Sequence, residues 1–167
     1  MKLLEAINRR SSTRKFSDKE ITKEMIETIC HYGYKIPSAG ALYPLELFYV
    51  KDLEYETLRI SNTRNNLCVD RIITKLPNVY VICADFDKTC SKYGERGVRY
   101  VYMEAGHMAQ NICLVCEELG LGSCCVGAFD EKEVKQRYNL KFDPIYMIAI
   151  GYKDKMINHI INEQNTL

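Results

Sequence analysis

Two arginines and a serine near the N-terminus form the first pattern that could do chemistry. Arg10, Ser12 and Arg14 occupy alternate positions, and an extended backbone directs alternate side chains to the same side. Two guanidinium groups and a hydroxyl on one side would make an anion clamp, because an arginine fork matches phosphate oxygens in a bidentate manner. A solvated basic turn is the other interpretation. The residue types alone leave both open.

Two stretches of small residues could expose backbone to a flat ligand. The first, residues 38–41 (SAGA), lies in a loop bounded by Pro37 and Pro44. The second, Gly127-Ala128, follows a short strand expected after Gly122. Backbone without large side chains lets a ligand approach closely and offers it N–H and C=O groups. An ordinary connecting loop explains the first stretch equally well.

A long helix predicted over residues 98–119 is the element that must position these groups. It is apolar on nearly every face, so it needs cover on two sides, and we expect a second copy of the chain to supply part of that cover. Its polar side chains follow one helical stripe: Tyr100, Glu104, His107 and Asn111. Because burying unpaired polar groups is costly, we expect the stripe to pair across a dimer interface or to line a site.

The other predicted elements fit one domain over residues 1–167, of which 152–167 form a polar tail. Helices are predicted over residues 2–8, over 18–34 with Thr22 as the N-cap, and from an Asp130 cap to about residue 138. Strands are predicted over residues 46–51, 79–84 and 145–151, besides the one after Gly122. Residues 52–74 suggest a hairpin or a short helix, and residues 85–95 suggest a loop.

The composition excludes several classes of protein. The chain has 167 residues, of which 47% are hydrophobic and 27% are charged, as in ordinary globular domains. A net charge of +1 argues against a general nucleic-acid surface. The sequence has neither a signal peptide nor a run of about 18 apolar residues. We therefore expect a cytoplasmic protein that binds no nucleic acid and no membrane.

Eight cysteines could suggest a disulfide scaffold or a metal site. We expect neither, since most of the cysteines lie in apolar runs, where a free thiol packs as a small hydrophobic group. Cys113 and Cys116 match C-x-x-C, but they lie inside the long helix without a second pair at zinc spacing. Cys124 and Cys125 are strand neighbours and should point to opposite faces of the sheet.

Four motifs, in order, resemble the nitroreductase family of flavin enzymes. They are R-S-S-T-R-K-F at 10–16, the proline-bounded loop at 37–44, E-A-G-H-M-A-Q-N at 104–111 with L-G-L-G at 119–122, and the strand at 146–151. The forms P-S-A-G-A-L-Y-P-L-E-L and K-Y-G-E-R-G-x-R-Y are most similar to the SagB-type branch, whose members oxidise azoline rings in modified peptides. The usual nitroreductase loop has Asn-x-Gln-Pro-Trp, where this chain has Ala41, Tyr43 and Leu45.

The resemblance implies a fold and an assembly. The fold would be α+β, a three-layer α/β/α sandwich with a mostly antiparallel central sheet and a long central helix. Two chains would form an intertwined homodimer with FMN at the interface.

The resemblance also implies the site residues. The FMN phosphate and ribityl chain would be held by Arg10, Ser11, Ser12 and Arg14. The partner subunit would bring Pro37, Ser38, Ala39 and Gly40 to the flavin ring. The N5 edge of the ring would meet Val126, Gly127 and Ala128. Family members often add a basic residue after the last strand, where this chain offers only Lys153 and Lys155.

The predicted activity is that of an FMN-dependent oxidoreductase passing hydride between NADH or NADPH and a small organic acceptor, such as a nitro compound or a quinone. The alternatives are a SagB-type dehydrogenase that oxidises azolines, and a flavin-binding module without turnover. The titratable candidates for a role in catalysis are Tyr100, His107 and Lys92.

Overall fold

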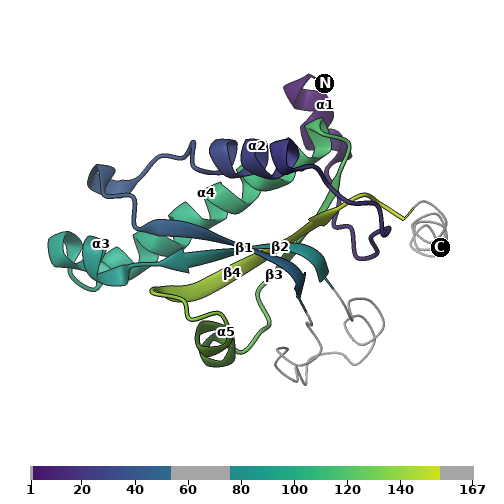
Figure 1. Cartoon of the computed structure of the whole chain (residues 1–167). Helices are drawn as coiled ribbons and strands as arrows, with labels where there is room; N and C mark the ends of the chain where they lie inside the picture. The colour runs from purple at the N-terminus through teal and green to yellow at the C-terminus, as the bar shows by residue number, and fades with distance from the viewer. Residues whose placement is uncertain (1, 54–75, 155–167) are drawn as a thin grey trace, which may run out of the picture.

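A computed structural model describes residues 2–53 and 76–154 of the chain (Figure 1). Its centre is a four-stranded sheet made of β1 (Leu45–Leu53), β2 (Leu76–Ala84), β3 (Gly122–Val126) and β4 (Asp143–Gly151). The strand order is β1-β2-β4-β3, and each neighbouring pair is antiparallel. All four predicted strands are confirmed. The longer strands extend beyond their predicted bounds because ladder pairing continues into less apolar residues.

Helices cover both faces of this sheet. On one face lie α2 (Lys23–Gly33) and α4 (Arg96–Glu118), and on the other lies α5 (Glu131–Arg137) (Figure 1). The sheet has an apolar core on each side, because alternate strand residues point to opposite faces. Ile148 belongs to the core under α4, and Met147 belongs to the core on the α5 side. The predicted α+β, three-layer α/β/α sandwich with an antiparallel central sheet is confirmed.

Two helices begin at the caps that the sequence predicts. The Thr22 hydroxyl accepts a hydrogen bond from the backbone N–H of Met25 at 3.2 Å. The Asp130 carboxylate accepts one from the backbone N–H of Glu133 at 2.9 Å. Each cap satisfies a donor that the first helical turn leaves unpaired.

The loop predicted over residues 85–95 is wrong, because most of it forms α3 (Phe86–Tyr93). Asp85 caps this helix by accepting a hydrogen bond from the backbone N–H of Lys88 at 3.2 Å. Gly94, with φ of 58°, ends it. The buried Thr89 and the half-buried Phe86 give α3 one packed side, while its charged residues face solvent. Those charges obscured the helical pattern in the sequence.

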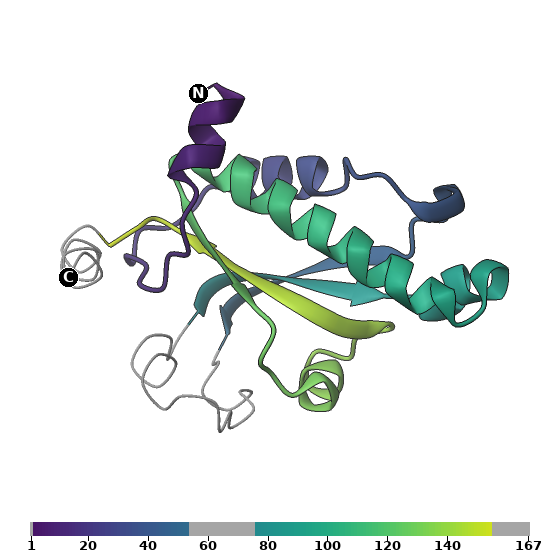
Figure 2. The same ribbon diagram turned by 180° about the vertical axis from the view of Figure 1, so that it is seen from behind.

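The first helix, α1 (Leu3–Arg9), projects beside the C-terminal end of α4 (Figure 2). Ala6 is its one buried residue. Its larger apolar side chains stay at the surface: Leu3 is 67% exposed and Leu4 is 73% exposed. On α4 itself Tyr102 and Met103 are about half exposed. This chain therefore covers α4 on one side and leaves part of its apolar surface bare.

Several expectations concern residues for which the structure gives little or nothing. Most of the hairpin or short helix expected over residues 52–74, and most of the tail over 152–167, lie outside the described residues. Within the loop predicted at 36–44, the chain makes a short 3-10 turn, η1 (Ala39–Ala41). Among the residues described, no helix is long and apolar enough to cross a membrane.

Candidate functional site

The predicted anion clamp is anchored to the sheet by its backbone. Ser12 forms a parallel bridge with Ser123 of β3, and Phe16 forms an antiparallel bridge with Lys153 after β4. The Thr13 N–H donates to the Ser123 carbonyl at 2.8 Å. The segment 10–16 therefore runs between the first residues of β3 and the chain that leaves β4.

A glycine lets this segment approach β3 so closely. Thr13 is buried against Gly122, and a Cβ atom at position 122 would collide with the Thr13 side chain. Because Thr13 points into the molecule, its neighbours Ser12 and Arg14 are directed outward, and both are exposed. Arg10, two residues further back, is half-buried. This outward direction is the one that the alternation in the sequence predicts for Ser12 and Arg14.

The two guanidinium groups of the clamp have no carboxylate partner within residues 2–53 and 76–154. Their charges act on thiols of β3 instead. Burial raises the pKa of Cys124, and the charge of Arg14 opposes that rise. A hydrogen bond with Cys113 is the largest cause that lowers the pKa of Cys125 to about 7, and the charge of Arg10 contributes. Both arginines thus lie within electrostatic reach of β3.

Open backbone lies at the end of the same strand. Gly127 is exposed, and a Cβ atom there would meet only the ring of Tyr146, at an ordinary contact distance of 3.8 Å. Packing within the chain therefore gives no reason for a glycine at 127. Unpaired cations and bare backbone around one strand suit a ligand with an anionic group and a flat polar ring. The residues present here therefore fit FMN.

The other predicted flavin loop is held in a different way. The Ala39 N–H donates to Oε1 of the buried Glu104 on α4 at 2.8 Å, whereas Oε2 of Glu104 is buried without a partner in the described part of the chain. Gly40 has φ of 62°, and a Cβ atom there would lie 2.7 Å from both the Lys92 ammonium and the Tyr93 hydroxyl. The loop therefore packs on α4 and on the end of α3.

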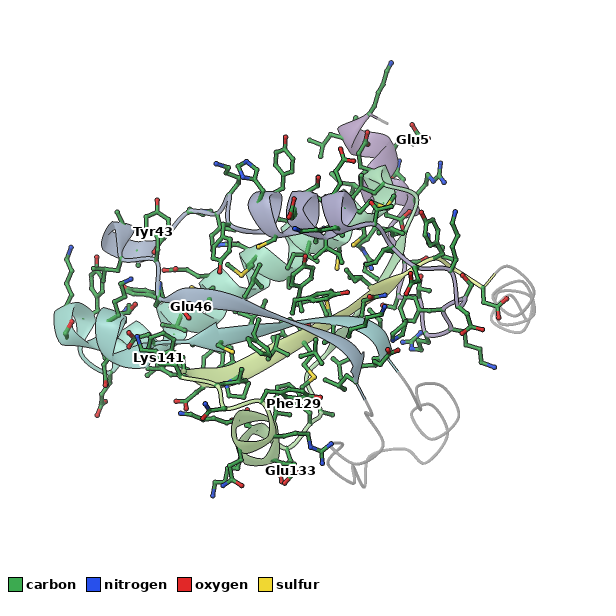
Figure 3. All side chains as sticks on the ribbon, in the orientation of Figure 1. Glu5, Tyr43, Glu46, Phe129, Glu133 and Lys141 are labelled. Atoms are coloured by element: carbon green, nitrogen blue, oxygen red, sulfur yellow. The ribbon has the colours of Figure 1, made fainter. Side chains whose placement is uncertain are left out.

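The loop and the clamp lie at opposite ends of α4 (Figure 1). Tyr43, just after the loop, and Glu5 of α1 mark these two ends in Figure 3. Along the helix, Glu104 holds the loop, while Glu117 contacts Lys153 beside the clamp. At 1.5 Å per residue these two glutamates are roughly 20 Å apart. One chain therefore places residues 10–14 beside the start of β3, and it places residues 37–40 at the other end of α4.

Three members of the polar stripe of α4, Tyr100, Glu104 and Asn111, contact other parts of their own chain. The Asn111 amide donates to the Lys35 carbonyl at 2.9 Å and to the Tyr32 carbonyl at 3.3 Å. The ring of Tyr100 meets that of Tyr93 edge-on, with centroids 5.2 Å apart. The Asn111 and Glu104 contacts fasten the α2–β1 connection to α4, whereas the Tyr100 contact joins α3 to α4. His107, the remaining member of the stripe, is exposed.

The lysine after the last strand already has a counter-charge. The Lys153 ammonium donates to Glu117 Oε1 at 2.7 Å, and the Glu117 side chain is only 2% exposed. A carboxylate this deeply buried needs a cation, because an unpaired buried charge is strongly destabilising. Lys155, the other candidate in the sequence, lies outside the described residues.

The cysteines are arranged as the strand pattern predicts, with one addition. Cys124 is buried in the core on the α5 side, while Cys125 is exposed and lies 3.6 Å from Cys113 on α4, measured between the sulfur atoms. This confirms that the two neighbours point to opposite faces. Seven cysteines fall in the described part of the chain, and all seven are free. The described part of the chain contains no group of three His, Cys, Asp or Glu side chains suited to a metal ion.

The sequence profile of the Nitroreductase family matches residues 7–152. The chain belongs to the nitroreductase family. A protein of Methanocaldococcus jannaschii named as a nitroreductase is 31% identical over 182 residues, which cover 92% of each chain. Family membership makes this chain an FMN-dependent oxidoreductase. It confirms the predicted enzyme class and cofactor.

Two further relatives bear on the activity. The microcin B17-processing protein McbC of Escherichia coli is 30% identical over 129 residues, covering 62% of this chain and 47% of that protein. A solved structure from Staphylococcus epidermidis, titled as an NAD(P)H:FMN oxidoreductase, superposes with a TM-score of 0.74 at 20% identity, covering 92% of this chain and 88% of that one. The second likeness supports the nitroreductase fold.

Proposed function

We propose that this oxidoreductase passes hydride between NADH or NADPH and a small organic acceptor, such as a nitro compound or a quinone. The observation that carries the proposal is the pair Arg10 and Arg14, which have no carboxylate partner within residues 2–53 and 76–154 and lie beside a strand that ends in open backbone at Gly127. Bound FMN supplies hydride exchange at its N5 atom. The family and the NAD(P)H:FMN oxidoreductase from Staphylococcus epidermidis support this choice of reductant.

The chain's own residues would bind and orient the cofactor. We assign the phosphate and ribityl chain to Arg10, Ser11, Ser12 and Arg14. Since the charge of Lys153 is matched by Glu117, the phosphate charge would fall on the two arginines.

The ring edge would meet the end of β3, where Gly127 is exposed. We assign this contact to Val126, Gly127 and Ala128. A backbone N–H aimed at the edge where hydride arrives would stabilise the charge that develops there.

We further propose that two chains complete the site as a homodimer, in which the partner subunit supplies the loop of Pro37, Ser38, Ala39 and Gly40. The positions of the loop and the clamp at Glu104 and Glu117, roughly 20 Å apart along α4, support this. The bare apolar side chains of α1 and α4 supply a surface for the second chain: Leu3, Leu4, Ile7, Tyr102 and Met103.

The dimer is tested by its molar mass. Size-exclusion chromatography with light scattering should give twice the mass of the chain, and Met103→Glu should weaken the dimer at least about tenfold, or ~1.4 kcal/mol. Lys132→Glu, an equally exposed change on α5, serves as the control and should leave the mass unchanged. A monomeric wild-type protein would contradict the proposed assembly.

A second candidate activity is the oxidation of azoline rings in a modified peptide, as in the SagB-type branch. The likeness to McbC favours it, although it covers only part of both chains. In this direction the substrate would reduce the flavin, and an acceptor would reoxidise it. Lys92 and Tyr93 converge on Gly40, and Glu104 binds Ala39, so these three titratable groups border the loop.

One purification separates these activities. The protein should be yellow, should gain thermal stability from added FMN, and should oxidise NADH or NADPH when a nitroaromatic or a quinone is present. Bleaching of the flavin by an azoline peptide, without reaction toward NADH or NADPH, would favour the second candidate. A yellow protein without turnover would be a flavin-binding module. A colourless protein that FMN does not stabilise would refute the cofactor site.

We also propose that residues 1–167 form a single FMN-binding domain and that the protein works in the cytoplasm. The family match over residues 7–152 supports the single domain. Limited proteolysis should leave one resistant core, and cell fractionation should recover the protein with cytoplasmic markers. Two independently stable fragments would contradict the first expectation.

A further inference from the structure

Two cysteines face each other between α4 and β3. The sulfur atoms of Cys113 and Cys125 lie 3.6 Å apart, and the two residues are 12 positions apart in the sequence. Cys113 is buried, whereas Cys125 is exposed. The nearby Cys116 and Cys124 are buried, and each packs in an apolar core on one side of the sheet. The facing pair therefore consists of one exposed thiol, Cys125, and one buried thiol, Cys113.

The geometry allows a bond between them. A disulfide needs a sulfur–sulfur distance of about 2.05 Å, so the two atoms must approach by roughly 1.5 Å from 3.6 Å. Rotation of the two side chains can supply an approach of this size. The exposed position of Cys125 gives a small oxidant access to the pair.

The surroundings divide the pair into an attacking and a resolving thiol. A hydrogen bond with Cys113 is the largest cause that lowers the pKa of Cys125 to about 7, and Tyr146 and the charge of Arg10 add to it. The same hydrogen bond and burial raise the pKa of Cys113. Since the thiolate is the nucleophile in disulfide exchange, Cys125 reacts first.

We propose that Cys113 and Cys125 form a reversible dithiol–disulfide pair that a low-molecular-weight disulfide oxidises. The Cys125 thiolate attacks one sulfur of the oxidant, forms a mixed disulfide and releases one thiolate. Cys113 then loses its proton to solvent and attacks the Cys125 sulfur, which releases the second thiolate. The two cysteines lose two electrons and two protons, and the oxidant takes them up as two thiols. This site needs no FMN and adds to the proposed function.

The test treats the purified protein with glutathione disulfide, caps the remaining thiols with N-ethylmaleimide and cleaves after glutamate. Cleavage at Glu104, Glu117, Glu118 and Glu131 places the two cysteines in separate fragments, 105–117 and 119–131. We expect these fragments to be joined, two fewer thiols to be capped, and dithiothreitol to reverse both changes. Fragmentation of the joined peptides in the mass spectrometer then identifies the linked cysteines.

Matched variants assign the bond. Cys125→Ala and Cys113→Ala should each reduce the joined product at least about tenfold, whereas Cys124→Ala and Cys116→Ala should retain it. If a variant fails to fold, the fragment map of the wild-type protein still decides. Fragments that stay separate, a glutathione adduct that persists on Cys125, or a link that survives in Cys125→Ala would overturn the proposal.

Discussion

The clamp at residues 10–16 and the loop at residues 37–41 are both predicted to touch one flavin, yet the molecule holds them by different means. Backbone pairing fixes the clamp to β3 and to the chain after β4. The loop packs on α3 and α4, and among the described residues its backbone is tied to α4 by the hydrogen bond from Ala39 to the buried Glu104; it contains positive φ angles at Gly40 and Ala41. The clamp therefore extends the sheet by backbone pairing, whereas the loop is attached to α4 through the Glu104 side chain.

This difference in attachment suits the clamp and the loop to different roles. An element paired to the sheet offers a fixed position for a charge, and a phosphate gains most from fixed cations. A loop held by one carboxylate can be displaced without breaking the core. Substitutions that alter the enzyme without unfolding it should therefore be tolerated in the loop rather than in the clamp.

The largest expected effect comes from disrupting the contact between Thr13 and Gly122, which holds the clamp against β3. Gly122→Ala places a Cβ atom against the buried Thr13, and overpacking of this kind costs up to about 3 kcal/mol. Urea unfolding should show the loss, and FMN binding should fall with it. Gly127→Ala is the matched control: its Cβ meets only Tyr146 at 3.8 Å, so the free energy of unfolding should change by less than about 0.5 kcal/mol. Equal stability of the two variants would refute the contrast.

The loop should be less costly to release. Glu104→Ala removes the acceptor for the Ala39 N–H and leaves a cavity, for an expected loss of about 2 kcal/mol in unfolding free energy. Hydrogen exchange should then increase in residues 37–41 and stay unchanged in residues 10–16. Increased exchange in both segments would mean that they form one cooperative unit.

Next in size is the effect of a single charge in the clamp. Arg14→Ala should weaken FMN binding by more than ~1.5 kcal/mol, the lower range for a charged hydrogen bond. Titration of the apoprotein with FMN, followed by fluorescence, measures this. Unchanged affinity would count against the assignment of Arg14 to the phosphate.

The same variant can show whether clamp and loop come from different chains. Gly40→Val should damage the loop, because of its positive φ and the nearby Lys92 and Tyr93. In a mixed dimer of Arg14→Ala and Gly40→Val chains, one site would carry both changes and the other neither. Random mixing should therefore restore roughly a quarter of the sites. No recovery, from chains shown to exchange, would argue that each site belongs to one chain.

The smallest expected effect is a shift in the reactivity of Cys125. Its pKa is lowered to about 7, first by Cys113 and also by Arg10. Alkylation of Cys125 should therefore increase as the pH rises through about 7, where an ordinary thiol remains protonated. Arg10→Gln removes a positive charge, so this midpoint should move upward by less than about one pH unit. Lys92→Gln, in the loop region, should leave it unchanged.

The sequence could predict those parts of the fold that depend on periodicity and caps. The strands, α4 and the Thr22 and Asp130 caps needed only local patterns. The helix α3 was missed because charged residues are interspersed among its packed side chains and obscure the helical period. The exposure of Leu3 and Leu4 could not be foreseen, since an apolar pattern predicts a face that needs cover but does not identify the element that covers it.

The site was predicted in its residue types but not in its arrangement. The alternation of Arg10, Ser12 and Arg14 indicated their common outward direction, yet only the fold shows Thr13 seated on Gly122. Nothing local relates Cys113 to Cys125, because their meeting depends on how α4 packs on β3. Glu104 and Glu117, two glutamates in a largely apolar helix, were the available signals of buried tertiary contacts.

The pairing of the clamp also has a consequence for the growing chain. Ser12 pairs with Ser123, and Phe16 pairs with Lys153. These contacts join the first part of the chain to parts that are synthesised much later. Contacts of such high sequence separation form late, because closing the long loop between them costs entropy before any contact repays it. During synthesis α4 should therefore form before β4 completes the sheet and before the clamp pairs, and the chain should acquire FMN only after that pairing.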